Sequence, residues 1–211
     1  MLQVTTNDVR ERIEAVRSLA IFNDCIRSHV LDEIDLSEIA GKLGANQYCQ
    51  ARQNIAPSMQ WRVFSHCASV TRLYALYESF VYQLISDWIT KVPVLYPSYS
   101  ALPANVVIAH RVGVGQLLQK WWGGPRTEHL TELKLIDGLF RGLSSANPYT
   151  LLSDAFFIDL ANLRLEELDR LFGRVGLSGL TEWLTNHTQM KQYCEGAGVT
   201  VGDRLKDLID Y

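Results

Sequence analysis

The sequence has 211 residues, of which 47% are hydrophobic and 20% charged, and its formal net charge is -3 at pH 7. That charge argues against a protein that binds nucleic acid or an anionic membrane over its whole surface. The polar N-terminus lacks a signal core and no apolar run approaches the roughly 18 residues of a membrane span, so we expect a cytoplasmic protein with a single domain over residues 1–211.

The first half of the chain predicts two long helices. Apolar residues recur every three or four positions over residues 7–30, which predicts the first helix. A polar, glycine-punctuated stretch follows, with one short helix predicted at 36–43. The strongest periodicity covers residues 58–91, and Pro93 is expected to end this central helix.

The second half predicts further helices with short connections. We expect helices at 104–122, 127–143 and 180–185, and a continuous helix at 153–175 that begins with Ser153 and Asp154 as cap and acidic first turn. Asp203 opens an amphipathic segment that reaches Tyr211. Strand-like alternation is confined to residues 199–201, too short for a sheet. The predicted fold class is therefore all-α, an antiparallel helical bundle.

Metal and cofactor motifs are missing from the sequence. The four cysteines are widely spaced without a Cys-x-x-Cys pair, so we expect reduced, mostly buried thiols. No two histidines stand four residues apart, and neither glycine-rich run follows a predicted strand, as a phosphate-binding loop would require. We therefore expect no metal and no cofactor.

Basic side chains on the central helix form the first candidate site. Arg62 and His66 are one turn apart and share a face, and Arg72 follows on the same helix. Such a set offers cations and a proton-transferring group to an RNA phosphate, but a solvated polar face gives the same pattern. Glu78 lies near the apolar stripe and needs a partner, which is either a structural salt bridge or a site.

Four short motifs carry a family resemblance. They are LYALYESFV at 73–81, NPYTLL at 147–152, ANLR at 161–164 and LFGRVGL at 171–177. In order and spacing they resemble a branch of the HEPN superfamily, small helical domains of prokaryotic toxin and antiphage-defence systems. The resemblance covers roughly residues 8–211.

The resemblance implies a homodimer of antiparallel bundles with an RNA-cleaving site across the pair. Family members carry an Arg, a polar residue, three to five more residues and a His. The His acts as acid or base in metal-independent cleavage, and the Arg holds the phosphate. Glu78 matches the family's acidic position and is the implied catalytic residue. Asn162 and Arg164 match the polar pair of a later helix, so the implied RNA-binding residues are Arg62, His66, Arg72, Asn162 and Arg164.

The chain departs from the family pattern at the signature itself. No Arg is followed by His after four to six residues, and the nearest case, Arg62 to His66, has three between them. In this branch the signature normally lies on the last long helix, which would follow Tyr211. The resemblance therefore implies a ribonuclease in full-length form and an inactive 211-residue chain, either a fragment that lacks the catalytic strip or a member without it.

A noncatalytic interaction module is the alternative. The mild acidity of the chain and the aromatic side chains of Trp121, Trp122 and Trp183 fit a helical surface that binds a partner or neutralising protein. No membrane partner is expected.

Overall fold

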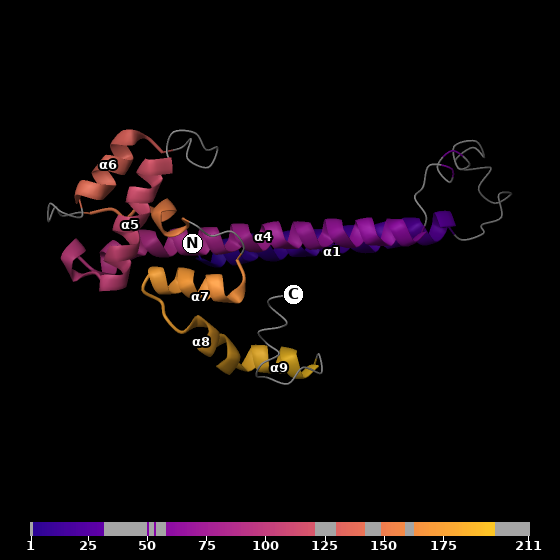
Figure 1. The fold of residues 1–211 in the computed structure, drawn as a ribbon. Helices are drawn as coiled ribbons and strands as arrows, with labels where there is room; N and C mark the ends of the chain where they lie inside the picture. Colours follow the sequence, from indigo (N-terminus) through magenta and orange to yellow (C-terminus); the bar gives the residue numbers. More distant parts are fainter. Residues whose placement is uncertain are drawn as a thin grey trace. The chain divides into compact units, whose positions relative to one another are not determined.

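The computed structural model describes residues 2–31, 50, 53, 58–120, 130–141, 149–158 and 163–196 (Figure 1). Within these ranges the regular structure is helical and no strand occurs, which confirms the all-α prediction. No helix in the described ranges has both the length and the apolar content needed to cross a membrane. The segments predicted as a short helix at 36–43, as strand-like at 199–201 and as a terminal helix at 203–211 lie outside the described residues.

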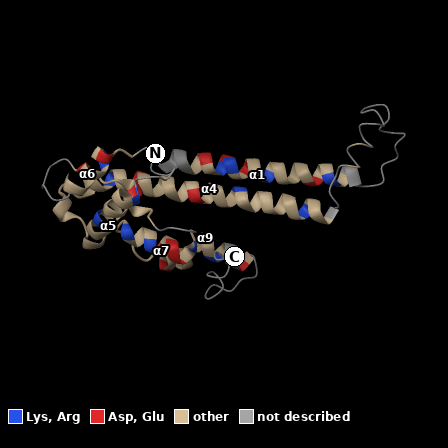
Figure 2. Ribbon diagram, turned by 45° about the horizontal axis from the view of Figure 1, so that its top comes forward, with Lys and Arg blue, Asp and Glu red and all other residues tan. Residues whose placement is uncertain are grey.

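The chain divides into two compact units, residues 1–83 and 84–211. The first unit contains α1 (Leu2–Leu31) and the first part of α4 (Ser58–Leu95). These two segments run alongside each other in opposite directions (Figures 1 and 2).

Partly buried side chains on both helices follow helical spacing. On α1 they include Val16, Ala20 and Asn23, and on α4 they include Trp61 and the small Ser65 and Ser69. Spacings of three and four residues place such side chains on one face of each helix. Each helix of the first unit therefore has one partly covered stripe.

The predicted ends of both long helices need correction. α1 begins at Leu2, five residues before the predicted start. α4 continues through Pro93 to Leu95. Proline lacks a backbone N–H and so removes one helical hydrogen bond, to the carbonyl four residues earlier, while Tyr96 N–H donates to the Val92 carbonyl at 2.9 Å and closes the last turn.

The second unit surrounds a core of buried aliphatic side chains. Its helices are the last part of α4, α5 (Ala104–Lys120), α6 (Glu132–Arg141), α7 (Leu165–Arg174), α8 (Leu180–Asn186) and α9 (Thr188–Gly196), with 3-10 turns η1 (Tyr99–Ala101) and η2 (Ser153–Phe156). A core cluster joins α5, α6 and η2 through Val114, Leu117, Leu130, Leu135, Ala155 and Ile158. η2 and α6 thus cover the buried face of α5.

The expected continuous helix at 153–175 is wrong. η2 ends at Phe156 and α7 begins at Leu165. The carbonyls of Phe156 and Ile158 accept hydrogen bonds from the Arg174 guanidinium, at 3.1 and 2.9 Å. A side chain from the end of α7 thus supplies donors to this turn, which a helix would supply from its own backbone.

The helices near the end of the described chain, α7, α8 and α9, begin and end at positions that side chains help to define. α7 buries Leu165, Leu168 and Leu171, and it has acidic residues in its first turn and Arg174 in its last, which suits the helix dipole. α8 confirms the helix predicted at 180–185, whereas α9 was not predicted. Asp169 of α7 accepts hydrogen bonds from the Thr181 backbone N–H at 3.0 Å and its hydroxyl at 2.8 Å, and thereby caps α8.

Candidate functional site

The basic residues of the first unit are exposed along α4. Arg62 and His66 are exposed and share a face, one turn apart. Arg72 is also exposed, but it follows His66 by six residues and so lies about 120° around the helix axis. The structure therefore keeps Arg62 and His66 together and places Arg72 on another face.

Glu78 lies far from this basic pair along the helix. It is half-buried and follows Arg62 by 16 residues, which is about 24 Å along the axis at the rise of an α-helix. One copy of α4 therefore does not bring Glu78 to Arg62 and His66. Among the described residues no Lys or Arg forms an ion pair with Glu78, so the structural salt bridge finds no support there.

Two tyrosines form the surroundings of Glu78. The rings of Tyr74 and Tyr77 have centroids 6.1 Å apart and are tilted by 49°. Burial, together with the neighbouring Tyr74 and Glu78, raises the pKa of Tyr77 to about 12. The phenol of Tyr77 is therefore neutral at physiological pH.

The second pair of predicted RNA-binding residues belongs to the other unit. Arg164 is exposed directly before α7, and its carbonyl accepts a hydrogen bond from Leu168 N–H at 2.8 Å. Asn162 lies outside the described residues. Of this pair, the structure therefore places Arg164.

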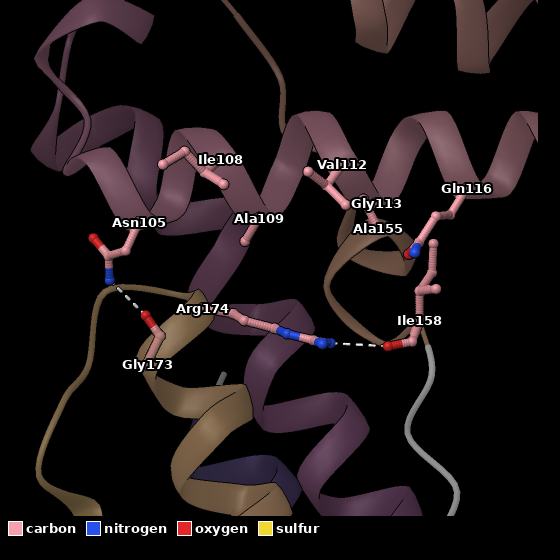
Figure 3. A pocket seen from close by; sticks show the side chains of 10 residues that line it. All are labelled: Asn105, Ile108, Ala109, Val112, Gly113, Gln116, Ala155, Ile158, Gly173 and Arg174. Carbon is pink, nitrogen blue, oxygen red and sulfur yellow. Dashed lines mark hydrogen bonds between the residues drawn. The ribbon is translucent and has the colours of Figure 1, made fainter.

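The second unit contains a cleft between α5, η2 and α7 (Figure 3). Its volume is about 480 Å³, within the range of small-molecule sites. Asn105 Nδ2 donates to the Gly173 carbonyl at 2.6 Å at one end, and Arg174 crosses toward Ile158. The lining is Asn105, Ile108, Ala109, Val112, Gly113, Gln116, Ala155, Ile158, Gly173 and Arg174. No carboxylate or imidazole lines the cleft, so these residues supply no general acid or base.

His110 is buried on α5 and holds two neighbouring segments together. Its Nε2 accepts a hydrogen bond from Leu152 N–H at 3.1 Å, and its Nδ1 lies 3.1 Å from Tyr99 Oη. Because Nε2 accepts, the neutral ring carries its proton on Nδ1, which donates to Tyr99. Burial, together with the positive Arg111, lowers the pKa of His110 to about 4. With both nitrogens engaged and 1% exposure, His110 is a structural residue.

Sequence reasoning overlooked this histidine, although a signal was present. His110 falls four residues after Val106 and four before Val114, both of them buried. That spacing places position 110 on the buried face of α5. A histidine at such a position needs polar partners, but nothing in the sequence points to Tyr99 and Leu152.

The structure describes two of the cysteines and the surroundings of possible metal ligands. Cys25 and Cys67 are both exposed, so the expectation of mostly buried thiols is wrong for these two. In the described ranges no three His, Cys, Asp or Glu side chains gather closely enough to hold a metal ion.

Comparison with known protein families matches most of the chain. The HEPN_MAE_28990-like HEPN family model matches residues 1–193 of the chain. No curated protein and no solved structure is significantly similar to the chain.

Proposed function

The chain belongs to the HEPN superfamily, and on this basis we propose that it is the RNA-binding domain of a toxin or antiphage-defence system. The match to the family over residues 1–193 is the observation that carries the proposal. In its full form the protein acts as a metal-independent endoribonuclease and works as a homodimer. The 211-residue chain binds RNA without cutting it, because its sequence has no Arg followed by His at the family spacing.

Exposed cations on α4 support the RNA-binding part of the proposal. The guanidinium groups of Arg62 and Arg72 form no ion pair among the described residues. No carboxylate there competes with an RNA phosphate for binding to them. Figure 2 shows that charged residues are otherwise sparse along α4.

A binding titration tests this proposal. A labelled single-stranded RNA is titrated with the protein at several salt concentrations. Replacing Arg62 or Arg72 by alanine should weaken binding and lower the salt slope by about 0.7 for each lost phosphate contact. Lys134→Ala is the matched control, because Lys134 is an exposed cation on α6 with no proposed role. Equal effects of all three variants would contradict a site on α4.

The noncatalytic interaction module is the second candidate, and Trp183 favours it. This side chain is 60% exposed on α8, and its ring centroid lies 4.8 Å from that of His187. Exposed tryptophans are frequent anchors of protein interfaces. Trp121 and Trp122 lie outside the described residues. Capture of a partner protein that is lost in Trp183→Ala, together with no affinity for RNA, would favour this function.

A further inference from the structure

The first part of α4 carries a second stripe of apolar side chains, separate from the one partly covered in the first unit. Its members are spaced by four, three, four, three and four residues and are Met59, Val63, His66, Val70, Leu73 and Tyr77. An alternation of four and three is the heptad spacing of helices that pack side by side in coiled coils. At about 100° per residue, the centre of the stripe lies about 120° around the axis from Ser65 and about 80° from Ser69.

Most of this stripe faces solvent in a single copy. Met59 is 72% exposed, Val63 48%, Val70 49% and Leu73 41%, while Tyr77 is half-buried. Scattered exposed apolar residues are ordinary on a protein surface. Four large apolar side chains in heptad register on one helix face are not scattered, and they match a surface that another helix covers.

We propose that this α4 stripe is the surface on which a second copy of the chain packs. The inference deepens the homodimer of the proposed function by assigning its interface. It does not depend on RNA binding.

The stripe suits a second copy, because two copies present the same heptad series to each other, as a twofold interface requires. No Lys, Arg, Asp or Glu is a member of the stripe, and the Arg62 guanidinium lies at its edge beside His66. His66 is the one polar member, and a single polar residue at such a position fixes the register of paired helices.

The exposed area also fits a pair. If a fully exposed large side chain presents roughly 200 Å², the four exposed apolar members and the adjacent Tyr74 present about 500 Å² per copy. Two copies then cover on the order of 1,000 Å², the size at which a specific interface begins. The exposed apolar side chains of α1 are not needed to reach it.

The mass of the protein in solution tests the assignment. Light scattering across a dilution series compares the unaltered chain with Val70→Glu and Leu73→Glu, which place a charge inside the stripe. Phe64→Glu is the matched control, since Phe64 is 68% exposed but lies about 120° around the helix from Val70. We expect a dimer for the unaltered chain and the control, and an apparent dissociation constant raised roughly 30-fold or more in the two stripe variants.

Each outcome separates the interface from the homodimer itself. A dimer that persists in Val70→Glu and Leu73→Glu overturns the stripe but leaves the homodimer. A monomer at every concentration of the unaltered chain overturns both. Dissociation by Phe64→Glu as well also overturns the assignment to this face. Val63→Ser and Val70→Ser repeat the test without a charge, and circular dichroism verifies that every variant remains helical.

Discussion

Gly113 of α5 lies directly against the backbone of Ala155 in η2. A Cβ atom built at position 113 would be 1.9 Å from the Ala155 carbonyl oxygen and 2.6 Å from its carbonyl carbon. The contact is with backbone, so no side-chain rotation relieves it. The close approach of α5 and η2 therefore requires glycine at this position.

Gly113→Ala should destabilise the second unit. The extra methyl group forces α5 and η2 apart next to the core, at a cost of about 1–3 kcal/mol or more. Gly115→Ala is the control on the same helix, because a Cβ there meets nothing within 4 Å. We expect that variant to be stabilised by about 0.5–1 kcal/mol through its helix propensity. Thermal unfolding followed by circular dichroism compares them, and equal shifts would contradict the predicted packing.

The protein should become less stable as the pH is lowered, because of His110. Its pKa is about 4 in the folded protein against an ordinary 6.5, so the unfolded chain binds the proton more readily. The stabilisation from neutral His110 is fully present above pH 6.5 and is lost as pH falls toward 4. That loss amounts to roughly 3 kcal/mol. Urea unfolding at several pH values measures it.

His110→Leu provides the comparison for that pH dependence. His110→Leu should be less stable at pH 7, because Tyr99 and Leu152 lose a hydrogen-bond partner. It should also have a flatter dependence of stability on pH. An unchanged slope in His110→Leu would show that another group is responsible.

The cap on α8 gives a third prediction. Asp169→Ala removes the acceptor for the Thr181 backbone N–H and hydroxyl, and should cost about 1 kcal/mol of stability. Glu182→Ala also removes an acidic side chain, but Glu182 lies within the first turn of α8 and makes no such cap. Chemical denaturation should rank Asp169→Ala below Glu182→Ala. The reverse order would contradict the capping role.

Arg174 gives a fourth prediction, for the turn between η2 and α7. Arg174→Leu keeps much of the apolar stem but leaves the carbonyls of Phe156 and Ile158 without this donor. We expect a loss of about 1–3 kcal/mol. Arg170→Leu is the control from the same helix, because Arg170 forms a partly exposed pair with Glu167 and such pairs contribute little. Equal unfolding midpoints would argue against the bridging role of Arg174.

Periodicity predicted the long helices well, because their apolar spacing extends over many turns. It misjudged the segment between Ser153 and Val175, where Leu163, Leu168 and Phe172 continue a helical pattern. There the break is determined by contacts distant in sequence, of Arg174 with the carbonyls of η2 and of Ala155 with Gly113. Such contacts leave no periodic signal in the residues that they shape.

The candidate site was less predictable than the fold. Sequence reasoning found Arg62 and His66 on one face, since that follows from their spacing of four. It assigned Arg72 to the same RNA-binding set, although the helix rotates Arg72 to another face. The polar partners of His110 were out of reach, because Tyr99 and Leu152 approach it only through the fold.

RNA integrity in metal-free buffer tests the central claim most directly. The 211-residue chain is incubated with labelled single-stranded RNA and a chelator, and the same sample is analysed for bound and for cleaved RNA. We predict a salt-sensitive complex, weakened in Arg62→Ala, in which the RNA stays intact because no Arg and His stand at the family spacing. Cleaved RNA that disappears with His66→Ala, or no complex at any salt concentration, would contradict the account.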